Sequence, residues 1–234
     1  RGCRFESCRA RQTTETGNAM TQTPNTDFGI TDLWPTRILH RRVGGCESWN
    51  KELIKLVREM ERANRKLTTD YLEQDLFNMD QPAVNWLREE VNGTVIEYLR
   101  NLGIDYPVNW TITGWPNVNR FGDYHDPHNH PWSYLSGTYF VKMPTTREPL
   151  QTRSDVRPGC ITFYDPRQGV NMMAIKNDPY VEPEHTVLPE PGLMMLWPAF
   201  VKHFVHPNLS KETRISISFN IVLKWSDDYL PDQS

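Results

Sequence analysis

The stretch that decides the fold is Arg214–Trp225, "RISISFNIVLKW". Its first six residues alternate between polar and apolar side chains, with Arg214, Ser216 and Ser218 as the polar members. Successive side chains of a β-strand point to opposite faces of the sheet. The stretch therefore predicts a strand with one strongly apolar face for packing and one polar face that carries an arginine.

Similar stretches precede it in the chain, each short, rich in β-branched or aromatic residues, and followed by a turn with Gly or Pro. They are "VNWTITGW" (108–115), "YLSGTYFVKM" (134–143), "GCITFYD" (159–165) and "GLMMLWPAF" (192–200). Two segments with apolar residues at helical spacing, 47–67 and 81–104, come before all of them. We therefore expect a mainly β (α+β) protein, a sandwich or small barrel with N-terminal helices packed outside.

The domain organisation follows from composition. Residues 1–28 are polar and Thr-rich without a hydrophobic period, which predicts a disordered tail or an upstream extension, followed by a single domain over 29–234. The net charge of −3, from 26 basic and 29 acidic residues, favours neither nucleic acid nor an anionic membrane as a partner. Four cysteines without zinc spacing indicate a reduced, cytoplasmic protein. The exposed helical layer makes a homodimer a reasonable expectation.

A cluster of imidazoles stands just before the strand at 134–143. His128 and His130 are two residues apart in "HNHP", so an extended backbone would aim both at the same side. Two ligands hold a metal poorly, and a third must come from elsewhere in the fold. His203, at the corner between two predicted strands, has the most suitable setting. The sequence thus predicts a metal site made by these three histidines.

The predicted anchor for an anion lies eleven residues beyond His203. Arg214 points from the polar face of its strand into the β structure, where an unpaired charge would cost several kcal/mol. A guanidinium binds a carboxylate through two parallel hydrogen bonds, so a ligand carboxylate is a natural partner. An internal ion pair with a protein carboxylate is the simpler alternative. A metal combined with a fixed cation suits a chelating keto acid.

Three motifs carry a resemblance to a known family. They are "PHNHPWSYLSGTYFVKMP" (127–144), "GCITFYDPR" (159–167) and "LWPAFVKHFVHPNLSKETRISISFN" (196–220), preceded by Trp-Pro-Thr at 34–36. In order and spacing, the chain resembles the iron(II)/2-oxoglutarate-dependent oxygenases, and among them a bacterial and phage branch. The resemblance covers nearly everything after the tail. It implies a double-stranded β-helix (jelly-roll) fold, with iron(II) as cofactor and 2-oxoglutarate as cosubstrate.

The resemblance also implies roles for individual residues. His128 matches the first metal ligand and His203 the distal one, while Arg214 and Ser216 match the Arg-x-Ser that binds the far carboxylate of 2-oxoglutarate. The residues expected to support the cosubstrate or the substrate are Tyr139, Asn117 and Asn119. The implied reaction is the hydroxylation of a small-molecule or peptide substrate, with release of succinate and CO2.

One position departs from the family pattern. The usual ligand set contains two histidines and one carboxylate, but the slot for the carboxylate holds His130. A three-histidine set with His128, His130 and His203 is our first interpretation. Asp126 is the alternative ligand, with His130 then outside the coordination sphere. The departure also leaves two other functions open, a three-histidine metal dioxygenase that uses no keto acid and a non-catalytic metal- or ligand-binding β-barrel.

Overall fold

The computed structural model describes residues 34–68, 75–145, 150, 152–167, 169, 178 and 181–230. The described residues from Thr36 onward belong to one compact unit. The predicted tail over 1–28 and the predicted start of the domain at residue 29 lie outside the described residues.

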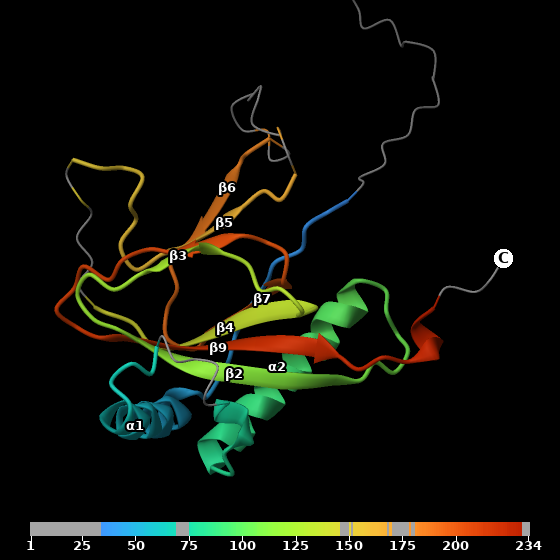
Figure 1. The fold of residues 1–234 in the computed structure, drawn as a ribbon, viewed down its shortest axis with the longest axis horizontal. Coiled ribbons are helices and arrows are strands. Elements are labelled where there is room, and N and C mark those ends of the chain that lie inside the picture. The colour runs from blue at the N-terminus through green and yellow to red at the C-terminus, as the bar shows by residue number, and fades with distance from the viewer. Residues whose placement is uncertain are drawn as a thin grey trace, which may run out of the picture. The chain divides into compact units, whose positions relative to one another are not determined.

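The described β structure consists of two antiparallel sheets (Figure 1). The larger sheet has the strand order β1-β7-β4-β9-β2 and the smaller one has the order β3-β8-β5-β6. The strands of the larger sheet are β1 (Leu39–Arg42), β2 (Trp110–Asn119), β4 (Leu135–Lys142), β7 (Leu193–Pro198) and β9 (Arg214–Leu223). Those of the smaller sheet are β3 (His125–His128), β5 (Ile161–Tyr164), β6 (Glu184–Val187) and β8 (His203–Val205).

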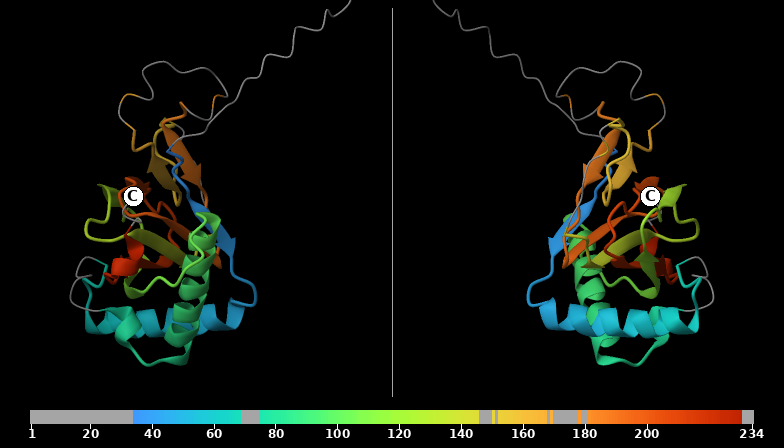
Figure 2. Two further views of the ribbon diagram at one scale, coloured as in Figure 1. Left: turned by 90° about the vertical axis from the view of Figure 1, so that its right-hand side faces the viewer. Right: turned by 90° about the vertical axis from the view of Figure 1, so that its left-hand side faces the viewer.

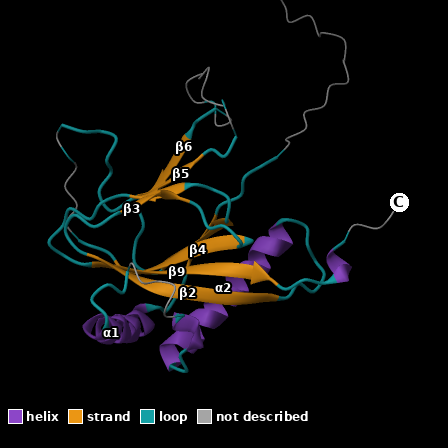
Figure 3. Ribbon diagram, in the orientation of Figure 1, coloured by secondary structure: helices purple, strands orange, loops and turns teal. Residues whose placement is uncertain are grey.

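Two α-helices, α1 (Glu47–Ala63) and α2 (Pro82–Asn101), cover the face of the larger sheet turned away from the smaller sheet (Figures 2 and 3). Pro82 opens α2, where its missing N–H group costs nothing. Gly103 follows its end with φ +81° and donates its N–H to the carbonyl of Arg100. Both helices agree with the predicted segments within a few residues at each end. Two short 3₁₀ turns complete the described elements, Leu76–Asn78 and Asp227–Tyr229.

Alternation along the strands creates two separate cores. On β4, Tyr139 and Val141 belong to the core between the helices and the larger sheet. Phe140 and Met143 belong instead to a smaller core between the two sheets, together with Phe163. The larger sheet is therefore buried on both faces, and its second face is the one that can line a site.

The mainly β fold class with helices outside is confirmed. All five strands predicted from the sequence are present, as β2, β4, β5, β7 and β9. The strands β3, β6 and β8 have only three or four residues and were not predicted as strands. No helix in the described part of the chain is long and apolar enough to span a bilayer.

Candidate metal centre

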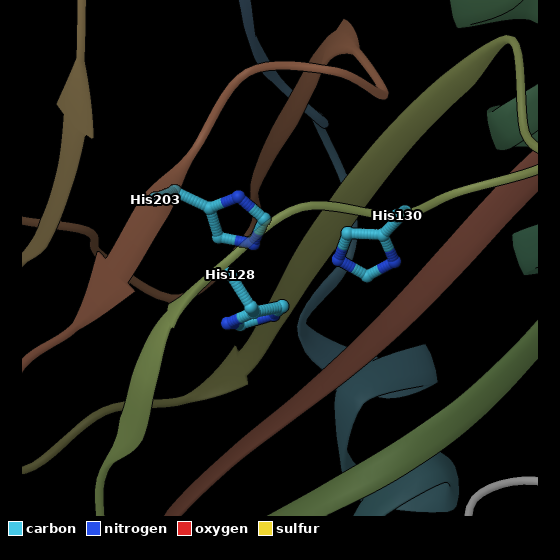
Figure 4. Close-up of side chains that lie close together, drawn as sticks. All are labelled: His128, His130 and His203. Carbon is cyan, nitrogen blue, oxygen red and sulfur yellow. The ribbon is translucent and has the colours of Figure 1, made fainter.

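Three histidines meet between the two sheets. His128 ends β3, His203 begins β8, and these two residues face each other in the antiparallel pair. His130 lies in the loop after β3. Each of the three offers one ring nitrogen, and these nitrogens all lie within 4.8 Å of one another. Figure 4 shows the three imidazoles turned toward one another, as the sequence predicts for a metal site.

The backbone fixes the orientation of two of these rings. The Nδ1 atoms of His128 and His203 lie 2.5 Å and 3.2 Å from the carbonyl oxygens of Asp126 and Val201. Because a carbonyl oxygen only accepts hydrogen bonds, each Nδ1 carries the proton. The lone pair is then on Nε2, the nitrogen that a metal ion requires. Both histidines are thus held in the tautomer of a metal ligand.

The third ring is held in a different way. The backbone N–H of His130 donates to the carbonyl of Ala199 at 3.0 Å, and its ring stacks on Trp115 with centroids 5.9 Å apart. Burial and the neighbouring His128 lower its pKa to about 4, while a side-chain interaction with Asn220 acts in the opposite direction. His130 therefore remains neutral at physiological pH.

Burial has the same effect on His203, which is only 3% exposed. Its burial, followed by the nearby His128 and His130, lowers its pKa well below the usual value. Neutral imidazoles are good ligands for iron, zinc, copper and nickel ions. The cluster of three converging ring nitrogens therefore fits a divalent transition metal.

The same pocket contains the predicted anion anchor. Arg214 lines it together with the three histidines and is 2% exposed. Its Nη2 donates to Oδ1 of Asn119 at 3.2 Å, and Nδ2 of Asn119 lies 3.2 Å from Nε2 of His125. The positive charge of Arg214 is thus fixed in position, and it contributes, after burial, to lowering the pKa of His125 to about 4.

Hydroxyl and amide groups surround this anchor. Asn117 pairs with Ser216 across β2 and β9, and its Nδ2 donates to Oγ of Ser218 at 2.9 Å. Oδ1 of Asn117 is buried and has no hydrogen-bond partner among the described residues. Asn117, Ser216 and Ser218 all line the pocket. This end of the pocket is therefore polar and cationic, and it fits the carboxylate of a ligand whose other end reaches the histidines.

The structure corrects the prediction for Tyr139. Its hydroxyl donates to Oδ1 of Asn50 on α1 at 2.7 Å, and its ring belongs to the core under the helices. The pocket is lined instead by its neighbours Thr138 and Phe140. Since adjacent residues of a strand face opposite sides, Tyr139 cannot support a ligand in this pocket. The prediction placed Tyr139 on the wrong face of β4.

The alternative carboxylate ligand, Asp126, does not join the cluster. It is exposed, and the group of side chains that could hold a metal contains His128, His130 and His203 without it. Its contribution is the backbone carbonyl that accepts from His128. The sequence reasoning missed Thr138, which lines the pocket, and Asn220, whose side chain interacts with His130.

The sequence comparison finds a family model that matches the part of the chain with the site. Residues 113–220 match the family model described as "Putative 2OG-Fe(II) oxygenase". The match includes the three histidines and Arg214, and confirms the resemblance noted in the sequence. The description names iron(II) and 2-oxoglutarate, the two cofactors that were predicted. No protein of curated function matches this chain in sequence.

Solved structures with the same fold are distant in sequence. A Pseudomonas putida prolyl-4-hydroxylase has a TM-score of 0.53 at 10% identity, over 80% of this chain and 88% of that one. A Trichoplax adhaerens prolyl hydroxylase, in complex with a hypoxia inducible factor peptide fragment, has 0.53 at 14% identity, over 79% and 83%. The epimerase SnoN in complex with Fe3+, alpha ketoglutarate and nogalamycin RO has 0.51 at 14% identity, over 84% and 86%.

At these identities the likeness shows the fold, and it confirms the predicted jelly-roll core with helices outside. Residues 113–220 are thus similar in sequence to the iron(II)/2-oxoglutarate oxygenases, and the fold of the chain agrees with that similarity.

Proposed function

We propose that this protein is an iron(II)- and 2-oxoglutarate-dependent dioxygenase that hydroxylates an organic substrate and releases succinate and CO2. One observation carries the proposal. The pocket that contains the nitrogen cluster of His128, His130 and His203 also contains the buried Arg214. Metal ligands and a carboxylate anchor in one cavity are what a chelating keto acid needs.

The histidines would hold iron(II), which with 2-oxoglutarate supplies the oxidising power of the reaction. Backbone carbonyls keep the Nδ1 protons of His128 and His203 in place, so both rings present Nε2 without reorganisation. None of the three ligands brings a negative charge. The dianionic keto acid would therefore be the first anion to reach the metal.

Arg214 and Ser216 would bind the carboxylate at the other end of 2-oxoglutarate. Arg214 is held by Asn119 before any ligand arrives, so little side-chain entropy is lost on binding. Phe140 and Ile161 also line the pocket and keep water away from the middle of the ligand. The pocket thus orients the cosubstrate along a line from the guanidinium to the histidines.

Anaerobic titration tests the proposal. Addition of Fe(II) and then 2-oxoglutarate to the protein is expected to produce a weak visible charge-transfer band. Admission of air should then consume dioxygen and yield succinate. His203→Ala should abolish both signals, whereas His185→Ala, which changes an exposed histidine outside the pocket, should leave them intact. Binding of Fe(II) without a band or succinate would overturn the use of 2-oxoglutarate.

The neutral ligand set favours one second candidate, a three-histidine dioxygenase that takes dioxygen without a keto acid. Such an enzyme has no use for Arg214 in the same pocket. The two candidates differ in stoichiometry, because only the first forms one succinate for each dioxygen consumed. Dioxygen uptake that is independent of 2-oxoglutarate would favour the second.

A further inference from the structure

The three histidines differ in what holds the nitrogen that does not face the cluster. In His128 and His203, Nδ1 donates to the carbonyl of the residue two positions earlier, Asp126 and Val201. Each is a backbone contact within one short segment of chain. No described backbone carbonyl accepts a hydrogen bond from the ring of His130. Its ring must be oriented by something else.

The backbone brings His130 to the end of β9. The N–H of His130 donates to Ala199, the N–H of Ala199 donates to Tyr134, and the N–H of Tyr134 donates to Ile221. These hydrogen bonds measure 3.0, 3.1 and 2.8 Å. The loop that carries His130 is therefore fastened beside Ile221, and Asn220 is the adjacent residue of β9.

The side chain of Asn220 lies on the pocket face of β9. Asn220 pairs with Ser136 on β4, and two-residue steps along the strand lead from it to Ser218 and Ser216, which line the pocket. Its Oδ1 is buried and makes no hydrogen bond of ordinary geometry with any described residue. Buried carboxamide oxygens are rarely left without a donor, because the lost hydrogen bond with water costs about 1–3 kcal/mol. This acceptor needs a donor.

His130 can supply this donor, because its side chain interacts with the side chain of Asn220. Figure 4 shows one ring nitrogen of His130 turned toward the other two histidines and one turned away. A metal ion takes the lone pair of the first nitrogen and leaves the proton on the second.

We propose that Asn220 is the positioning residue for His130, with its carboxamide oxygen accepting the ring N–H that points away from the cluster. The proposal rests on the proposed function, because it assumes that His130 is a metal ligand. It explains how the chain uses a histidine in the slot of the carboxylate. A carboxylate has no N–H to satisfy, but an imidazole needs an acceptor that fixes its tautomer and its plane.

The test compares Co(II) affinities of the 234-residue protein and its variants under anaerobic conditions. Asn220→Ala should weaken Co(II) binding by about 10–100-fold, the usual loss when a ligand loses its outer partner. Asn220→Asp keeps an acceptor and should stay within about 3-fold of the wild type or bind more tightly. Asn101→Ala, which removes an exposed asparagine at the end of α2, is the matched control and should change nothing.

A double-mutant cycle isolates the pair. In the His130→Asp background there is no ring N–H to accept, so Asn220→Ala should then change the Co(II) affinity by less than about 3-fold. An equal loss in both backgrounds would mean that Asn220 acts on the site without His130. That result would overturn the inference.

A measurement on the wild type covers the case in which Asn220→Ala fails to fold. In the Zn(II) form labelled with 15N-histidine, the ring N–H of His130 should be protected from exchange with water, assigned by its loss in His130→Asp. A rapidly exchanging N–H overturns the role of Asn220. Failure of the wild type to bind Co(II) would instead overturn the metal site and the proposed function. Tight binding that Asn220→Ala leaves unchanged would overturn only this inference.

Discussion

The two faces of β9 lie in different environments. The apolar face packs against the core beneath the helices and is fully buried, and the polar face lines the pocket between the sheets. The residues of the apolar face are Ile215, Ile217, Phe219 and Ile221. Those of the polar face are Arg214, Ser216, Ser218 and Asn220.

Within the ten residues of β9, the apolar face therefore contributes to stability and the polar face to the candidate site. Full burial of each aliphatic or aromatic side chain stabilises the fold by about 1.5–3 kcal/mol. Burial of the guanidinium and hydroxyls of the other face costs free energy unless they are hydrogen-bonded. Burial of Arg214 therefore adds little to stability, and under the proposed function it is the ligand carboxylate that compensates for it.

The largest expected effect comes from the apolar face. Ile217 is completely buried and lies opposite Tyr139 on β4, so Ile217→Ala leaves a cavity in the core. We expect a loss of about 2–5 kcal/mol in the free energy of unfolding. Urea denaturation measures it. At a temperature where the variant is still folded, its KM for 2-oxoglutarate should stay within about 3-fold of the wild type.

Ile96→Ala on α2 is the matched control, because this isoleucine is 40% exposed. The expected loss there is below about 1 kcal/mol. A large change in KM with Ile217→Ala would show that the two faces are energetically coupled, contrary to the comparison.

The next effect belongs to the polar face. Arg214→Gln removes the charge but keeps a hydrogen-bonding group, and a hydrogen bond to a charged partner is worth about 1.5–3 kcal/mol. The KM for 2-oxoglutarate should therefore rise about 10–100-fold, as measured by succinate formation. Arg214→Lys restores the charge without the planar fork and should recover only part of the loss. An unchanged KM in Arg214→Gln would remove Arg214 from the binding of the cosubstrate.

The sequence predicts the larger elements of this fold well, because their hydrophobic patterns are long. The alternation in β9 runs from Arg214 to Ile221, and the helical spacing of α1 and α2 extends over 17 and 20 residues. The strands β3 and β8, which carry two of the three histidines, are too short for such a pattern. Their pairing is decided by contacts between residues about 75 positions apart, such as His128 with His203.

The residues of the candidate site could likewise be predicted only in part. His128, His130, His203 and Arg214 were predicted, and they do line one pocket. The prediction for Tyr139 failed because a shift of one residue reverses the face of a strand, and a strand buried on both sides shows no alternation that fixes the parity. Asn220 was missed because its proximity to His130 depends on the loop hydrogen bonds, which leave no sequence signal.

A smaller effect tests whether the Ser216 hydroxyl on β9 contacts the ligand and whether Tyr139 on β4 faces away from it. Ser216→Ala should raise the KM for 2-oxoglutarate about 2–12-fold, the equivalent of one neutral hydrogen bond of about 0.5–1.5 kcal/mol. Tyr139→Phe is the control, since its hydroxyl donates to Asn50 under the helices. It should lower stability by about 1 kcal/mol without changing KM. A raised KM in Tyr139→Phe would mean that this side chain reaches the ligand after all.

The smallest predicted effect concerns His206, which is 2% exposed and belongs to the structure around the pocket, with no place in the metal cluster. Its Nδ1 accepts the backbone N–H of Arg157 at 3.1 Å, and its Nε2 lies 2.7 Å from the hydroxyl of Thr162. Both nitrogens are thus used by the protein. Burial, followed by the charges of Arg157 and Arg214, lowers its pKa to about 4.

Because the pKa of His206 is lowered by folding, the unfolded chain binds its proton more readily than the native protein between pH 6.5 and about 4. Stability therefore falls as the pH falls through this window, and His206 should account for about 0.7 kcal/mol between pH 7 and pH 6. Urea denaturation of the metal-free protein at the two pH values measures the loss. In His206→Gln the loss of stability between pH 7 and pH 6 should be smaller by about 0.7 kcal/mol, since glutamine does not titrate. An equal loss of unfolding free energy in the wild type and in His206→Gln would mean that His206 does not contribute to the pH dependence of stability.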